Sequence, residues 1–310
     1  MENQTEVSEF ILMGLTNLFK LYNVLFTVFL LLYLATLVGN GVIIIVILTE
    51  PHLQTAMYFF LGNLSCLDIF YFTVTVPKML AGFLSDLHII SLKDCIAQLH
   101  FFHFLGSSEV ILLGVMAYDR YVAICKALLY TLIMRKELCI LMAAATWCTG
   151  FFHALMHAVV TACFSFCGPN HVEHFFCDIK PLLKLACGST YLNLMLLSTL
   201  TSFVAMTPFI ITIISYLYLI TFLLFKIQSQ SGQQKALSTC GSHLIVVALL
   251  YVPVLFNYML PTVGASSQWE MILTLIYSAV TAVLNPLIYT LRNQEVKTAM
   301  KKIVVKKIFN

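Results

Sequence analysis

The sequence predicts an all-α membrane protein: a bundle of seven transmembrane helices with a short amphipathic eighth helix. Composition is the first reason, because 60% of the 310 residues are hydrophobic and only 10% are charged, whereas soluble domains carry about 25% charged residues. The second reason is that long apolar runs recur along the whole chain. A helix needs roughly 20 such residues to cross a bilayer, and seven segments reach that length: 22–48, 57–84, 95–119, 138–163, 192–225, 236–261 and 269–291.

The carboxy-terminal stretch predicts the eighth helix. Lysines surround a set of apolar residues that recur at helical spacing, namely Val296, Met300, Ile303, Val304 and Ile308. A basic amphipathic helix of this kind lies on an anionic membrane surface, and the periodicity favours it over a disordered tail. We therefore expect a single domain, 1–310, composed of an extracellular amino terminus (1–21), the helix bundle (22–291) and a cytoplasmic tail (292–310).

The distribution of Lys and Arg predicts the orientation of the chain. With the amino terminus outside, twelve of these residues fall in inner segments and five in outer ones, in agreement with the positive-inside rule. Asn3, in Asn3-Gln4-Thr5, is then a glycosylation acceptor on the outer side. The net charge of +3 reflects this topology, so we expect membrane lipid around the chain and no nucleic-acid partner.

Four cysteines fall on the predicted outer side. Cys95 opens the third apolar run, and the long connection 164–191 contains Cys167, Cys177 and Cys187. In an oxidising compartment these four allow three pairings. We expect at least one bridge, because closing a long loop stabilises the folded chain; the alternative is that some of them remain free.

Two sets of charged residues in apolar surroundings are candidate functional sites. Asp119 and Arg120 stand where the third apolar run ends. Arg120 can form an ion pair with Asp119 and release it when the helices shift. The alternative is that Arg120 only anchors the end of the helix at the membrane surface. Asp68 and Glu109 lie inside apolar runs. Buried carboxylates are costly in a bilayer, so these two must pair, take up a proton or bind a cation.

A series of motifs resembles one family over essentially the full length of the chain. The motifs follow the family order, and they are Gly39-Asn40, 57–65 followed by Asp68, Pro77–Leu80, Met116–Cys125, Ser215-Tyr216, Lys235–Leu244 and Asn285–Tyr289. Taken together they resemble the odorant (olfactory) receptors, a branch of the rhodopsin-like G-protein-coupled receptors. The long second outer loop is similar to that of the tetrapod-type class.

The resemblance implies a function and its partners. It implies a plasma-membrane receptor that binds a small, volatile, apolar odorant and activates a stimulatory heterotrimeric G protein, which raises cyclic AMP. The alternative is a rhodopsin-like receptor for an endogenous lipid or metabolite outside the nose. No nucleophile motif or metal-spaced His/Cys cluster appears in a water-facing segment, so we expect no enzyme activity and no cofactor apart from an allosteric sodium ion.

The resemblance also implies roles for individual residues. It pairs Cys95 with Cys177 and Cys167 with Cys187, and it places a sodium site at Asp68 and Glu109, helped by Asn40 and Asn285. The residues implied in G-protein coupling and switching are Asp119, Arg120, Tyr121, Tyr216 and Tyr289. Family position and helical spacing direct the following residues into the odorant pocket: Phe102, His103, Gly106, Ser107, Thr201, Val204, Tyr251, Phe256, Tyr258 and Ser278.

Overall fold

The computed structural model describes residues 7–14, 21–85, 88–167, 170–226, 229–256, 271, 274–275, 282–288, 296 and 298–299, without the side chains of 230–232, 235–239 and 242. Several predictions fall outside these residues. They are the glycosylation acceptor Asn3, the pocket residues Tyr258 and Ser278, the switch residue Tyr289, most of the seventh predicted span and the amphipathic tail.

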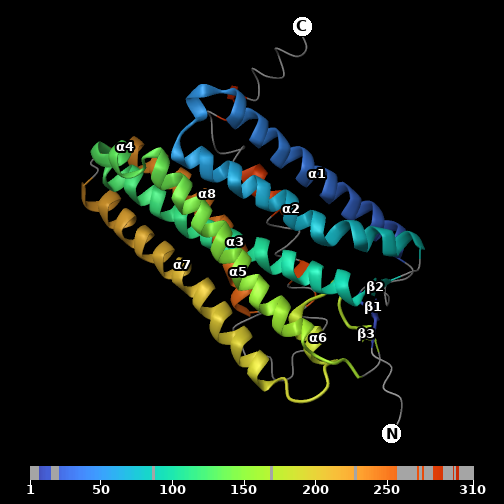
Figure 1. Cartoon of the computed structure of the whole chain (residues 1–310). Helices are drawn as coiled ribbons and strands as arrows, with labels where there is room; N and C mark the ends of the chain where they lie inside the picture. Colours follow the sequence, from blue (N-terminus) through green and yellow to red (C-terminus); the bar gives the residue numbers. More distant parts are fainter. Residues whose placement is uncertain are drawn as a thin grey trace.

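Within the described residues the chain is a bundle of long helices (Figure 1). In chain order the helices are α1 (Tyr22–Thr49), the 3-10 turn η2 (Pro51–Leu53), α2 (Ala56–Ser85), α3 (Leu92–Cys125), the 3-10 turn η3 (Ala127–Leu129), α4 (Tyr130–Ile133), α5 (Lys136–Ala162), α6 (Ile179–Leu183), α7 (Tyr191–Lys226) and α8 (Gln230–Val254). The first six predicted spans therefore correspond to α1, α2, α3, α5, α7 and α8.

Five of these helices, α1, α2, α3, α5 and α7, are long and apolar enough to cross a membrane. Many of their large apolar side chains face outward: Leu31 is 61% exposed and Phe203 is 70% exposed. In water such a surface would be unfavourable, whereas in a bilayer it faces hydrocarbon. The outward apolar faces therefore fit the predicted membrane bundle.

Helix α3 is the centre of the bundle and packs against α2, α5, α7 and α8. Its first turn begins at Ser91, whose hydroxyl accepts a hydrogen bond from the Asp94 amide at 3.1 Å and donates one to the Asp94 carboxylate at 2.7 Å, a reciprocal helix cap. Small residues allow close packing. A Cβ at Gly114 would lie 2.6 Å from the Pro208 Cβ, and one at Gly150 would overlap the Ser108 hydroxyl, so neither position has room for a larger residue.

One end of the bundle carries a small three-stranded sheet that the sequence analysis did not predict. Strand β1 (Glu9–Leu12) pairs antiparallel with β2 (Ile89–Ser91) and parallel with β3 (His171–Val172). The strands are too short to leave a clear alternating pattern in the sequence. We call this end, with β1–β3 and residues 170–190, the sheet end, and the opposite end, with Asp119, Arg120 and α4, the Arg120 end.

Two disulfides hold the sheet end together. Cys95, in the first turn of α3, is bonded to Cys177, and Cys167 is bonded to Cys187; these are the pairs that the family resemblance implies. Phe10 of β1 is fully buried and makes an edge-to-face contact with Phe166 at 5.2 Å between ring centroids. The segment 164–191 is thus fixed to both α3 and the amino-terminal strand.

Candidate functional site

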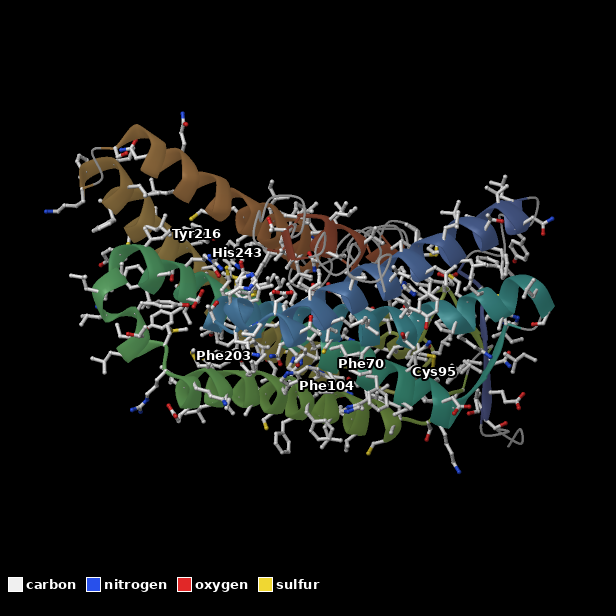
Figure 2. All side chains as sticks on the ribbon, turned by 90° about the horizontal axis from the view of Figure 1, so that it is seen from above. Phe70, Cys95, Phe104, Phe203, Tyr216 and His243 are labelled. Atoms are coloured by element: carbon white, nitrogen blue, oxygen red, sulfur yellow. A yellow bond between two sulfur atoms is a disulfide. The ribbon has the colours of Figure 1, made fainter. Side chains whose placement is uncertain are left out.

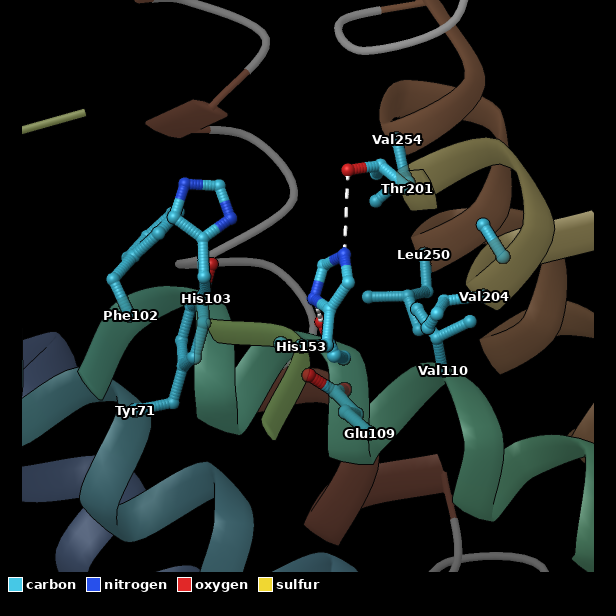
Figure 3. A pocket seen from close by; sticks show the side chains of 13 residues that line it. Tyr71, Phe102, His103, Glu109, Val110, His153, Thr201, Val204, Leu250 and Val254 are labelled. Atoms are coloured by element: carbon cyan, nitrogen blue, oxygen red, sulfur yellow. Dashed lines mark hydrogen bonds between the residues drawn. The ribbon is translucent and has the colours of Figure 1, made fainter. Parts of the chain in front are cut away.

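A pocket lies among α2, α3, α5, α7 and α8, on the side of the bundle centre nearer the sheet end (Figure 3). We call it the core pocket; its lining residues are Tyr71, Phe102, His103, Gly106, Ser107, Glu109, Val110, His153, Thr201, Val204, Ala205, Leu250 and Val254. The volume is about 50 Å³, whereas pockets for drug-sized ligands span about 300–1,000 Å³. A ligand of several carbon atoms therefore enters only if the surrounding side chains move apart.

Aromatic rings stack toward the sheet end of the core pocket. Phe102 of α3 lies 4.9 Å from the Tyr71 ring of α2 and 4.2 Å from the Phe176 ring of the 164–191 connection, centroid to centroid. Phe176 is fully buried. This connection therefore supplies a ring that packs against Phe102, a residue of the pocket wall.

A second contact joins the same connection to the pocket. The His103 imidazole Nε2 lies 3.0 Å from the Asp178 carboxylate, which also accepts a hydrogen bond from the Ile179 amide at the start of α6. Burial alone would raise the pKa of Asp178, but the His103 hydrogen bond and charge outweigh it and lower the pKa to about 2. Asp178 is therefore a buried carboxylate that stays ionised and holds His103 in place.

His153 of α5 links three helices across the pocket. Its Nδ1 lies 2.8 Å from the Ser107 hydroxyl of α3 and its Nε2 lies 3.4 Å from the Thr201 hydroxyl of α7. Figure 3 shows the ring between Glu109 and Thr201, with the Thr201 contact drawn as a dashed line. These groups give an otherwise apolar pocket a polar strip that can orient a hydroxyl or carbonyl of a ligand.

The predicted pocket residues divide into four groups. Six of them line the pocket: Phe102, His103, Gly106, Ser107, Thr201 and Val204. Tyr251 is buried beside it, but its hydroxyl donates to the Val110 carbonyl at 3.0 Å. Phe256 is 54% exposed, lies in a π turn directly after α8 and is not among the lining residues. Tyr258 and Ser278 lie outside the described residues.

The two intramembrane carboxylates meet one amide. The Asn285 side-chain nitrogen donates to both Asp68 oxygens at 3.1 and 3.2 Å and approaches Glu109 at 3.5 Å. Asn40 donates to the carbonyls of Thr36 and Ala282. The side-chain oxygens of Asn40 and Asn285 are buried and accept no hydrogen bond from the residues that the structure describes.

This arrangement supplies oxygen ligands only, the kind that hard cations such as sodium prefer. Within the described residues no three His, Cys, Asp or Glu side chains form a metal-binding group. A cation here would therefore be held by two carboxylates and by the oxygens of Asn40 and Asn285.

At the Arg120 end, Asp119 has two partners. The Arg120 guanidinium lies 3.8 Å from one carboxylate oxygen, and the Tyr130 hydroxyl of α4 donates to the other at 2.8 Å. Asp119 is 1% exposed. Burial, together with the neighbouring Asp119 carboxylate, raises the pKa of Tyr130, which keeps the phenol protonated as a donor. Tyr121, the next residue along, packs against Tyr218 of α7 at 6.0 Å between ring centroids.

Tyr216 of α7 and His243 of α8 form a side-chain hydrogen bond between these two helices, and the Gln233 side chain of α8 donates a second one to the Leu223 carbonyl of α7 at 2.9 Å. The Tyr216 hydroxyl lies 2.8 Å from His243 Nδ1, and both residues are buried. Figure 2 shows them together near the Arg120 end, far from Cys95 at the other end. Elsewhere α7 and α8 contact each other little, so this bond is a prominent link between them.

Several residues at these sites were not predicted from the sequence. Asp178, Tyr130 and His243 each pair with a residue from a different segment. A buried carboxylate next to a predicted disulfide cysteine could have drawn attention to Asp178. Pairings across 75 residues, as between His103 and Asp178, leave no periodic signal in the sequence.

Comparisons with known proteins identify the family. A family profile described as "Olfactory receptor" matches residues 29–307. The chain belongs to the olfactory receptor family. Similar relatives include human Olfactory receptor 12D1, which is 56% identical over 97% of this chain and 94% of its own length, and human Olfactory receptor 12D2, which is 54% identical over 98% and 99%. Mouse Olfactory receptor 4E2 is 44% identical over 99% and 98%.

Membership of the olfactory receptor family settles the class of protein. The chain is a multi-pass G-protein-coupled receptor with a seven-helix membrane bundle, and it is not an enzyme. The six described long helices are thus six of its seven membrane helices.

Proposed function

We propose that this olfactory receptor binds a small, volatile, apolar molecule in the core pocket and activates a stimulatory heterotrimeric G protein, which raises cyclic AMP. The observation that carries the proposal is the pocket itself. Aromatic and aliphatic side chains supply most of its wall, and His103, Ser107, His153 and Thr201 add a few polar groups. Burial of apolar surface would supply most of the affinity and the polar strip would supply orientation.

The absence of an unpaired acid at the sheet-end side of the pocket argues against amine ligands. Among the described residues there, Asp178 is the carboxylate nearest to His103, and it already holds this imidazole and the Ile179 amide. Glu109 lines the inner side of the pocket and is engaged by Asn285. A protonated amine would have to break one of these pairings, so we expect neutral ligands.

Signal transmission follows from the position of α3. Residues of the core pocket and the Asp119–Arg120 pair lie on this one helix, and Val110 and Arg120 are separated by roughly 15 Å at 1.5 Å per residue. A ligand that enlarges the contracted pocket favours conformations in which the helices around it move apart. Release of Asp119 from Tyr130 and Arg120 would then free the guanidinium for a G protein.

We propose that the sheet end is extracellular and the Arg120 end is cytoplasmic, in the plasma membrane. The two disulfides support this orientation, because such bonds persist in oxidising compartments. The surplus of Lys and Arg in segments at the Arg120 end supports it as well. Protease accessibility of residues 126–136 in sealed cells tests it, since digestion from outside would reverse the proposed orientation.

We also propose that sodium binds between Asp68 and Glu109 as an allosteric ion. Two buried carboxylates with one amide donor between them leave negative charge uncompensated in a low-dielectric environment. The side-chain oxygens of Asn40 and Asn285, which have no hydrogen-bond partner among the described residues, fit a hard cation. Asp68→Asn should abolish any sodium dependence of signalling, whereas unchanged dependence in this variant would exclude the site.

The proposed function is tested by a screen of volatile compounds and lipids with cyclic AMP as the readout. We expect responses to neutral volatile molecules, which Phe102→Ala and His103→Ala weaken at least tenfold in half-maximal concentration. Leu31→Ala, on the outer face of α1, is the matched control. Responses confined to lipids or metabolites would instead support a receptor for an endogenous ligand. An odorant response that neither pocket variant changes would exclude the core pocket.

A further inference from the structure

A second, larger cavity lies on the outside of the bundle, where α5 and α7 run side by side along α3 (Figure 1). We call it the lateral groove; its lining residues are Ile111, Gly114, Val115, Tyr118, Met142, Thr149, Phe203, Val204, Thr207, Pro208 and Ile211. Its volume is about 480 Å³, nearly ten times that of the core pocket and within the range of about 300–1,000 Å³ typical of ligand sites.

The groove exists because two helices approach α3 closely but stay apart from each other. Pro208 of α7 lies directly against Gly114, and Gly150 of α5 lies against Ser108, so both helices reach the α3 backbone. Direct contacts between α5 and α7 are few by comparison. The remaining space between them is open on the side away from α3.

The surroundings of the groove are hydrocarbon. Its rim includes Phe203, which is 70% exposed, and Ile211, which is 42% exposed, on a membrane-spanning helix. Only apolar atoms face the space, in part because the Thr207 hydroxyl donates back to the Phe203 carbonyl at 2.9 Å. Pro208 lies halfway along the 36-residue α7, so the groove is at the depth of the acyl chains and out of reach of lipid headgroups.

We propose that the lateral groove binds one acyl chain of a bilayer phospholipid. Water is excluded at this depth, and an unfilled apolar cavity of this size would forfeit the dispersion contacts of its lining. A flexible hydrocarbon chain supplies those contacts and needs no polar partner. Bound there, it touches Val204, which also lines the core pocket, so its occupancy bears directly on a wall of that pocket.

The test uses a phosphatidylcholine with a photoactivatable diazirine midway along one acyl chain, mixed into nanodiscs that contain the full-length receptor. After illumination, labelled positions are mapped by mass spectrometry. We expect labelling of 142–149 and 203–211 several-fold above that of the outer face of α1, where Leu31 and Val38 are comparably exposed at 61% and 64%. That face reports the ordinary lipid annulus.

Variants that fill the groove provide the control for specificity. Thr207→Trp and Met142→Trp, on different helices, should each reduce groove labelling several-fold and leave α1 labelling unchanged, whereas Leu31→Trp should leave groove labelling unchanged. Equal labelling of groove and α1 in the unmodified receptor would overturn the proposal. Groove labelling that survives both filling variants would overturn it too. Labelling below that of α1 would place another protein or a second copy there and likewise overturn it.

Discussion

The two ends of this receptor are held together by different kinds of interaction. At the sheet end, two disulfides, three short strands and the His103–Asp178 pair connect α3 to the 164–191 connection and to the amino-terminal strand. At the Arg120 end, the described links between separate segments include the hydrogen bonds Tyr130–Asp119 and Tyr216–His243. Covalent bonds thus fix one end, and individual hydrogen bonds hold the other.

This difference indicates where the molecule can move. A single hydrogen bond contributes about 1 kcal/mol, whereas a disulfide that closes a long loop contributes about 2–4 kcal/mol. A small molecule has only a few kcal/mol of differential affinity with which to shift a conformational equilibrium. It can therefore separate segments at the Arg120 end, while the sheet end keeps its structure and maintains the pocket.

The largest effect is expected from removing the Cys95–Cys177 disulfide. The bond joins residues 82 positions apart, and the double variant Cys95→Ser/Cys177→Ser should lose about 4 kcal/mol of stability. We expect little receptor at the cell surface and a lower melting temperature in detergent. Cys148→Ser, at an exposed free cysteine, is the control. A double variant with unchanged stability would contradict the covalent role assigned to the sheet end.

Acidification should also destabilise the sheet end, through His174. Burial lowers the pKa of this imidazole from 6.5 to about 4, so between these values the unfolded chain binds a proton that the folded chain does not. Stability is therefore lost as the pH falls from 6.5 toward 4, by about 2 kcal/mol at pH 5. Melting temperatures at pH 7 and pH 5 measure the loss.

Substitution of His174 isolates this contribution. His174→Gln should reduce the difference in melting temperature between pH 7 and pH 5, because the variant has no buried imidazole to protonate. His171→Gln, at an exposed position in the same connection, should leave the difference as it is in the unmodified receptor. An identical pH dependence in His174→Gln and His171→Gln would refute the role of His174.

At the Arg120 end, Tyr130→Phe should raise ligand-free signalling. The change deletes the hydrogen bond to the Asp119 carboxylate, which is worth about 1.5 kcal/mol because its acceptor is charged, or roughly tenfold in the balance between closed and open states. Basal cyclic AMP at matched surface expression is the readout, and Arg120→Ala should remain silent. Basal cyclic AMP at the unmodified level in Tyr130→Phe would show that this bond does not restrain Asp119.

The smallest effect is expected at the link between α7 and α8. Tyr216→Phe and His243→Leu should each lower the melting temperature. The double variant should be as stable as the less stable of the two single variants, which corresponds to a coupling free energy of about 1 kcal/mol between the two side chains. Additive losses would mean that the two side chains do not depend on each other. The mutant cycle thus measures the coupling between these two side chains, separately from the second α7–α8 hydrogen bond from Gln233 to the Leu223 carbonyl.

The apolar runs predicted most of the fold because burial in lipid leaves a continuous signal. The first span, predicted at 22–48, is α1 (Tyr22–Thr49). The third, predicted at 95–119, is α3 (Leu92–Cys125), since a charged pair ends an apolar run but does not interrupt backbone hydrogen bonding. Strand β1 was missed because its four residues pair with segments far along the chain.

In the candidate site, too, positions along one helix could be predicted, whereas contacts between separate segments could not. Residues on one helix, such as Phe102 and Ser107, could be assigned to the pocket from the family resemblance together with their helical spacing. Partners across helices could not: His103 meets Asp178 and Tyr216 meets His243 only after the tertiary structure forms. Phe256 lies in a π turn directly after α8, a local deviation from the ideal period of 3.6 residues on which an assignment by helical spacing depends.

The most direct test of a fixed sheet end and a movable Arg120 end is a pair of spin-label distances in the same receptor. One pair of labels replaces the exposed Leu128 and Gln234 at the Arg120 end and the other replaces Ile89 and Tyr191 at the sheet end, with the exposed free Cys148 and Cys163 changed to serine. On addition of nucleotide-free stimulatory G protein, the 128–234 distance should lengthen by several ångströms and the 89–191 distance should change by less than about 1 Å. Equal distance changes at both ends, or a distance change confined to the sheet end, would contradict the claim that the sheet end is fixed and the Arg120 end moves.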